Sequence, residues 1–130
     1  MRPPQFLIID DDPINNFICR KTIQMHINEP SLFSFTEATH ALDFLSSKPY
    51  IEFGDCSTIL LLDLNMPLFS GWDFLDAFHR LQENVKVRHK IYVLTSSHNP
   101  EDLDRAKGNC YVKDYIVKPI LLSTIVSISS

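Results

Sequence analysis

The sequence predicts an α/β fold in which a five-stranded parallel sheet is doubly wound, with helices on both faces. Two observations lead to this prediction. Short apolar runs of strand-forming residues recur along the chain and alternate with segments of helical periodicity. The strongest runs are apolar at every position, as in strands that are buried on both faces of a parallel sheet. The length of 130 residues and the hydrophobic content of 45% suit a single domain, residues 1–130.

The first strand is expected at residues 6–9, which form a continuous apolar run. Asp12 and Pro13 then predict the start of a helix, because aspartate is a favoured N-cap and proline suits the first helical position. Several large apolar residues fall on one side of that helix, as in an amphipathic helix: Ile14, Phe17, Ile18 and Met25.

The next elements are weaker in the sequence. A second strand is expected at residues 32–35 and a short helix at 37–47. The inner face of that helix would carry Ala38, Leu42 and Leu45. Pro49 and Gly54 indicate a loop after it.

The middle of the chain returns to strong signals. Residues 59–62 form a fully apolar third strand, and 65–71 form a loop that contains Pro67. A helix is expected at 72–81, with Phe74, Leu75 and Phe78 at helical spacing.

The fourth strand is expected at residues 91–94. Residues 97–99 with the following proline and acids predict a helix start, because acids suit its positive end, and Gly108 or Asn109 would end that helix. The fifth strand is expected at 115–117. The last helix, from Leu121 onward, should be short, since its residues are uncharged and mostly β-branched or serine.

The composition excludes several classes of protein. The net charge is −4 with acids and bases scattered, which is unlike the basic stripe of a nucleic-acid binder. The apolar run at 6–9 is too short for a signal peptide or a membrane span. Three cysteines at no metal-binding spacing indicate reduced thiols, mostly in the core, and hence a cytoplasmic protein without a membrane partner: Cys19, Cys56 and Cys110.

Polar residues follow four of the predicted strands, and the carboxyl ends of parallel strands meet at one edge, where ligands bind in open α/β sheets. They are Asp10, Asp11 and Asp12 after the first strand, Asp63 after the third, Thr95 and Ser96 after the fourth, and Lys118 after the fifth. Asp12 is better explained as the helix cap than as a ligand, because Pro13 follows it.

Carboxylates brought this close repel one another and need a neutralising partner. A hard divalent cation, Mg²⁺ or Mn²⁺, prefers oxygen ligands, and Lys118 can neutralise one acid. A metal ion and a lysine around an aspartate form the arrangement that phosphoryl transfer needs. Asp63 could then be a covalent acceptor, and a hydroxyl of Thr95 or Ser96 could donate to a phosphoryl oxygen.

Four motifs in order carry a resemblance to a known family. They are FLIIDDDP at residues 6–13, LDLNMP at 62–67 with Gly71, LTS at 94–96, and YIVKP at 115–119. The chain resembles the receiver domain of two-component response regulators, of the chemotaxis-regulator type, from about residue 6 to about residue 120. The resemblance implies the flavodoxin-like strand order 2-1-3-4-5.

The resemblance also implies roles for the acids. Asp63 would be the phosphoacceptor. The metal ligands would be Asp11, Asp63 and the backbone carbonyl of Asn65, with Asp10 contributing mainly through water.

The remaining site residues would bind the phosphoryl group or shape the site. Thr95 would be the switch hydroxyl with Ser96 beside it, Lys118 would bind a phosphoryl oxygen, and Tyr115 would be either the switch aromatic or a packing residue. Structural roles fall to Pro119, which in the family follows a cis peptide bond, and to Pro67 and Gly71.

The function implied is that of a phospho-accepting receiver, not an enzyme. A histidine kinase or a histidine phosphotransfer protein would be the donor, and an unknown output protein would bind the switched surface. Two alternatives remain: a receiver-like interaction scaffold that phosphate does not regulate, and a phosphatase similar to haloacid dehalogenases. The second needs an acid two residues after the nucleophile, where this chain has Asn65.

Overall fold

The computed structural model describes residues 4–52, 57–96 and 99–129. Five strands form one parallel sheet in the order β2-β1-β3-β4-β5, which confirms the predicted fold class and strand order. The strands are β1 (Gln5–Ile9), β2 (Leu32–Phe35), β3 (Thr58–Asp63), β4 (His89–Thr95) and β5 (Val112–Val117). The helices are α1 (Pro13–His26), α2 (Ala38–Ser46), α3 (Lys48–Glu52), α4 (Gly71–His79), α5 (Glu83–Lys86), α6 (Pro100–Lys107) and α7 (Leu122–Ser129).

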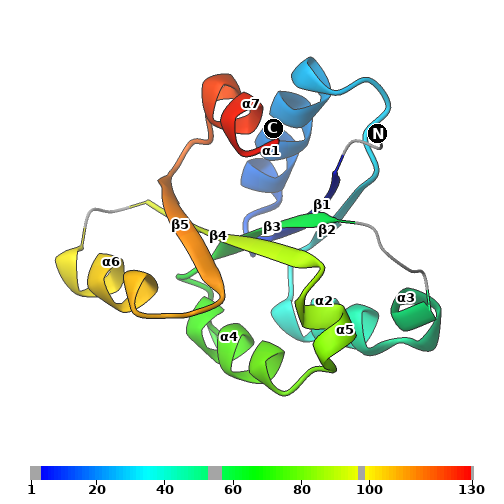
Figure 1. Ribbon diagram of the computed structural model, residues 1–130. Helices are drawn as coiled ribbons and strands as arrows, with labels where there is room; N and C mark the ends of the chain where they lie inside the picture. Colours follow the sequence, from blue (N-terminus) through cyan, green and yellow to red (C-terminus); the bar gives the residue numbers. More distant parts are fainter. Residues whose placement is uncertain (1–3, 53–56, 97–98, 130) are drawn as a thin grey trace.

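The helices form two layers around the sheet. Figure 1 shows α1 and α7 on one face, and α2, α4 and α6 on the other. Within the central strands, alternate side chains point to opposite faces. Leu7 and Leu60 belong to the core beneath α2 and α4, whereas Phe6 and Ile59 belong to the core beneath α1 and α7.

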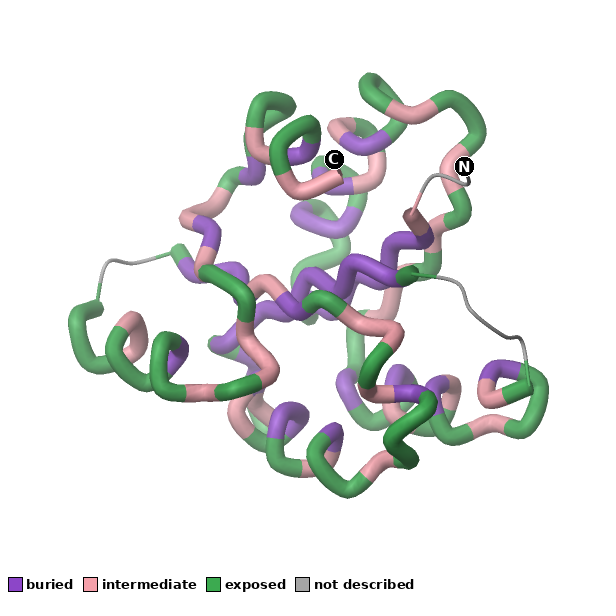
Figure 2. Tube along the Cα trace, viewed as in Figure 1, coloured by how far each residue is buried: buried purple, intermediate pink, exposed green. Residues whose placement is uncertain are grey.

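The continuous apolar runs are explained by this two-sided cover. Every residue of β1 and of β3 is buried, and Figure 2 shows the buried trace concentrated in the middle of the molecule. The flanking β2 and β5 carry several partly or fully exposed residues, which accounts for their weaker sequence signals.

Helix α1 packs through a different side from the apolar one singled out in the sequence. Four apolar side chains on that side are between 39% and 71% exposed: Ile14, Phe17, Ile18 and Met25. The buried positions are instead Asn15, Asn16, Cys19 and Ile23. The apolar residues thus share one side of α1, as predicted, but that side is exposed, and two asparagines occupy the buried side of the first turn.

The short helices α3 and α5 were not predicted. The loop expected at Pro49 is wrong, since this residue lies in the first turn of α3, where proline is tolerated. The predicted loop residue Gly54 lies outside the described residues, as do Cys56 and Ser97.

Helix ends agree closely with the sequence signals. The Asp12 carboxylate caps α1 by accepting a hydrogen bond from the Ile14 amide, as predicted. Asn99 caps α6 in the same way, through the Glu101 amide, and Gly108 ends that helix. Helix α4 begins at Gly71, one residue earlier than expected, after a capping box formed by Ser70 and Asp73.

The last strand is longer than predicted, whereas the last helix agrees with its prediction. Strand β5 begins at Val112, three residues before the predicted start, while α7 has eight residues and is short, as predicted. Of the cysteines expected mostly in the core, Cys19 is buried and Cys110 is exposed. Among the described residues, no helix is both long and apolar enough to cross a bilayer.

Candidate functional site

The strand register brings the predicted polar residues to one edge of the sheet. Ile9 pairs with Leu62 immediately before Asp10 and Asp63, and Thr95 pairs with Val117 immediately before Lys118. Carboxylate oxygens of Asp10, Asp11 and Asp63 lie within 4.8 Å of one another. The predicted convergence of these residues is therefore observed.

Lys118 contacts two of the three acids. Its Nζ lies 2.8 Å from Asp10 Oδ2 and 3.4 Å from Asp63 Oδ2. Burial lowers the pKa of Lys118, but the hydrogen bond to Asp10 and the negative charge of Asp63 outweigh this and raise the pKa above its usual value. The ammonium group is therefore charged and bridges the two carboxylates.

Asp10 is completely buried and held by several donors. Its Oδ1 accepts a hydrogen bond of 2.9 Å from the Asp12 amide, and its Oδ2 accepts hydrogen bonds from Asn15 Nδ2 and Lys118. Burial raises the pKa of Asp10, but these hydrogen bonds, Lys118 foremost, bring the pKa below its usual value. Asp10 is thus an ionised carboxylate with a fixed orientation.

Asp63 lies in a less favourable environment for charge. Its side chain is buried, and its Oδ1 accepts a hydrogen bond of 3.2 Å from the Asn65 amide. Burial and the charge of Asp10 raise the pKa of Asp63 to about 6, against the opposing effect of Lys118. The two neighbouring aspartates therefore have pKa values shifted in opposite directions.

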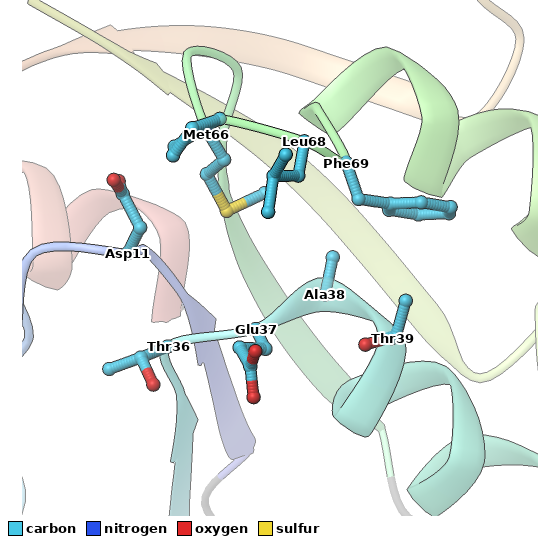
Figure 3. A pocket seen from close by; sticks show the side chains of 9 residues that line it. Asp11, Thr36, Glu37, Ala38, Thr39, Met66, Leu68 and Phe69 are labelled. Atoms are coloured by element: carbon cyan, nitrogen blue, oxygen red, sulfur yellow. The ribbon is translucent and has the colours of Figure 1, made fainter.

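Asp11 is the exposed member of the acid cluster and lines an open pocket of about 600 Å³. Figure 3 shows Asp11 on one wall, with Met66 and Leu68 of the β3–α4 loop and Glu37 of the β2–α2 loop around the same space. Leu68 is fully exposed and has a φ of 68°. Of the three acids, Asp11 is the one that lines this pocket.

The loop after β3 depends on a glycine. Gly71 is buried, and its amide donates a hydrogen bond to the Leu64 carbonyl at 3.1 Å. A Cβ at this position would lie 2.6 Å from the Asp63 carbonyl oxygen and 2.8 Å from Leu64 Cα. Only glycine lets the loop return this close to the acceptor residue. Pro67 is exposed in the same loop, and its carbonyl accepts a hydrogen bond from the Phe69 amide.

The remaining predicted residues lie on or after β4 and β5. Thr95 is completely buried, and its carbonyl accepts a hydrogen bond of 2.8 Å from the Lys118 amide. Ser96 is exposed. Tyr115 is partly buried and packs against the core beneath α2 and α4. The Lys118–Pro119 peptide bond is cis, as expected.

The donor set fits a hard divalent cation. Three carboxylates supply oxygen atoms at close range, one of them exposed to solvent, and such ligands suit Mg²⁺, which keeps several of its waters. Asn65 is exposed beside Asp63, in the position where its backbone was expected to contribute.

Sequence reasoning missed Asn15 and Asn16. Both are buried in the first turn of α1 and donate to Asp10, Asn15 to the carboxylate and Asn16 to the main-chain carbonyl. The sequence did contain a signal for them, since Asn15 and Asn16 lie at helical spacing from Cys19 and share its side of α1. Polar residues buried on a helix beside a group of acids need hydrogen-bond partners, and this would have pointed to Asp10.

Comparison with known proteins finds one family along almost the whole chain. The model of the response regulator receiver domain matches residues 6–129. The two-component response regulator ORR12 of Oryza sativa subsp. japonica is 25% identical over 120 residues, covering 92% of this chain and 90% of the relative.

Solved structures agree with the family match. A two-component response regulator from Cytophaga hutchinsonii superimposes with a TM-score of 0.86 and 28% identity, over 98% of this chain and 95% of that one. A response regulator receiver protein from Dyadobacter fermentans gives a TM-score of 0.84 and 26% identity, over 95% and 93% of the two chains.

Proposed function

The chain belongs to the response regulator receiver domain family, and on that premise we propose that it accepts a phosphoryl group on Asp63 in a Mg²⁺-dependent reaction. The observation that carries the proposal is the position of Asp63. It ends β3 as a buried carboxylate, 3.4 Å from a lysine ammonium and within 4.8 Å of two further acids. This concentration of cation and metal-ligand groups around one acid suits phosphoryl transfer.

The transfer forms one bond and breaks another. A carboxylate oxygen of Asp63 bonds to phosphorus while the bond between phosphorus and a histidine nitrogen of the donor breaks, and that nitrogen keeps the electron pair. The product is an acyl phosphate on Asp63. Lys118 stabilises the charge that develops on the phosphoryl oxygens, and a hydroxyl of Thr95 or Ser96 donates to one of them.

Asp11, Asp63 and the Asn65 carbonyl would hold the cation, with Asp10 acting mainly through water. When bound, Mg²⁺ (or Mn²⁺) neutralises the acids and stabilises negative charge on the phosphoryl oxygens. Burial and the charge of Asp10 raise the pKa of Asp63 to about 6, which supports a role for a cation here. A nearby cation favours the ionised carboxylate, which is the nucleophile.

A protein donor, a histidine kinase or a histidine phosphotransfer protein, is favoured by the surroundings of the site. Ile14 and Phe17 are exposed on α1, three and six residues after Asp11 in the sequence, and Leu68 is exposed in the lining of the pocket. Apolar side chains exposed beside a functional site are typical of a protein-binding surface.

Phosphorylation would alter the surface formed by α6, β5 and α7. The modification adds a charge of roughly −1.5 to −2. Thr95 moves toward the phosphoryl group, and Tyr115 changes its packing on β5. The two states of this surface would then differ in their affinity for an output protein, without any enzymatic turnover by the chain itself.

The test uses small phosphodonors in place of the unidentified kinase. The wild-type protein and Asp63→Asn are incubated with Mg²⁺ and acetyl phosphate, and intact mass is measured; beryllofluoride binding is followed by NMR. We expect the wild type alone to gain one phosphoryl group, and only with Mg²⁺. An unchanged wild-type mass together with no response to beryllofluoride would exclude phospho-acceptance. Sustained turnover of phosphate esters would instead favour a hydrolase.

A further inference from the structure

Two consecutive amides are buried at the start of α1, and the proposed transfer uses neither of them. Asn15 is 9% exposed and Asn16 is 7% exposed. Burying an amide costs free energy unless its polar atoms find partners. The Nδ2 groups of both side chains donate to the same residue, Asp10, whereas Asn16 Oδ1 is buried without a hydrogen-bond partner among the described residues.

The two amides bind different parts of Asp10. Asn16 Nδ2 donates to the main-chain carbonyl of Asp10 at 2.9 Å. Asn15 Nδ2 donates to the carboxylate oxygen Oδ2. Asn16 therefore ties the backbone of α1 to the end of β1, whereas Asn15 acts on the charged group itself.

The two oxygens of the Asp10 carboxylate bind different groups, and Asn15 contacts only one of them. Oδ2 accepts from both Asn15 and Lys118, and each carboxylate oxygen offers about two lone pairs. Oδ1 accepts a hydrogen bond of 2.9 Å from the Asp12 amide, and neither Asn15 nor Lys118 binds it. This oxygen could then accept a hydrogen bond from a water molecule on a bound cation.

We propose that Asn15 is a positioning residue for the metal site. It fixes the rotation of the Asp10 carboxylate, so that Oδ2 holds Lys118 and Oδ1 would serve a bound cation through water. Without Asn15, the carboxylate can rotate about its Cβ–Cγ bond, and Lys118 can move from Asp10 toward Asp63. This inference rests on the proposed function, because it assigns Asn15 to the same metal site.

Asn16 provides a matched control for Asn15. The two residues are identical in type, adjacent in sequence and similarly buried, and both contact Asp10. They differ in the group that they bind. A purely structural role for the pair would make their removal equivalent at the metal site.

The experiment compares Asn15→Ala, Asn15→Leu and Asn16→Ala with the wild type, all as full-length protein. Asn15→Leu fills the volume of the amide and removes its donor, so it separates the hydrogen bond from a cavity. Mg²⁺ affinity is measured from amide chemical shifts during titration, and stability from urea unfolding with a chelator present. Neither readout requires phosphorylation.

We expect both Asn15 variants to bind Mg²⁺ about 10- to 100-fold more weakly than the wild type, the usual effect of removing a group that orients a metal ligand. Asn16→Ala should lose stability and keep its Mg²⁺ affinity. Wild-type affinity in either folded Asn15 variant, or an equal loss in Asn16→Ala, would overturn the inference alone. A wild type that does not bind Mg²⁺ would overturn the proposed function as well.

Discussion

Replacing Asp63 by asparagine should stabilise the metal-free protein at neutral pH. Burial and the charge of Asp10 raise the pKa of Asp63 from 3.8 to about 6. This difference of about two pH units, at about 1.4 kcal/mol per unit, means that ionised Asp63 costs about 3 kcal/mol of folding free energy. Asparagine has nearly the same shape and no charge, so Asp63→Asn should recover up to about that amount.

The extra stability of Asp63→Asn over the wild type should increase with pH. A carboxyl group with a raised pKa binds more protons in the folded state than in the unfolded state between about pH 4 and 6. The wild type therefore loses stability as the pH rises through this window, and the loss is complete above it. The advantage of Asp63→Asn should be absent below pH 4 and constant above pH 6.

Urea unfolding of both proteins from pH 4 to 8, with a chelator present, measures this advantage. Asp10→Asn is the matched control, because hydrogen bonds from Lys118 and Asn15 bring the pKa of Asp10 below its usual value. Removing that charge should destabilise the protein. Added Mg²⁺ should reduce the difference in unfolding free energy between Asp63→Asn and the wild type, because Mg²⁺ binds the wild type more strongly than the variant. Equal stability of the wild type and Asp63→Asn at pH 8 would refute the reasoning.

Three further predictions concern other parts of the chain. Gly71→Ala should cost about 1–3 kcal/mol of unfolding free energy and weaken Mg²⁺ binding, because the added Cβ would lie 2.6 Å from the Asp63 carbonyl oxygen. The control is Gly108→Ala, where the atom nearest to the added Cβ is 3.6 Å away, and this variant should be neutral or slightly stabilising. Burial lowers the pKa of His89 to about 4, so the wild type should lose up to about 1.4 kcal/mol per pH unit relative to His89→Gln as the pH falls from about 6.5 to 4, measured by urea unfolding. Phe17→Ser should slow phosphoryl transfer from a phosphohistidine protein by about fivefold or more and leave labelling by acetyl phosphate unchanged; equal effects on both donors would place Phe17 outside the donor surface.

The sheet was predictable from the sequence because its central strands are covered on both faces. That cover requires apolar residues at every position of β1 and β3, and such runs are visible without a structure. The edge of functional residues was predictable for a related reason. Once the strands are known to be parallel, the positions of Asp10, Asp63 and Lys118 after them determine that the three meet.

Helix α1 shows what periodicity alone cannot predict. Its apolar residues mark one side clearly, yet the side that packs on the sheet begins with Asn15 and Asn16. Hydrogen bonds to Asp10 determine this orientation, and a scale of hydrophobicity contains no information about them. Helices α3 and α5 escaped prediction because elements of four or five residues depend on tertiary contacts more than on local preference.

The strand order also has a consequence for the course of folding. β1 must pair with β3 across an intervening strand and three helices, and Lys118 reaches the acids only when the edge strand β5 joins β4. Contacts between such distant segments form slowly, because loop closure costs entropy before the contacts repay it. Until β5 joins, Asp10 and Asp63 lack their ammonium partner. Neutralisation of these carboxylates by Lys118 should therefore coincide with completion of the sheet during refolding.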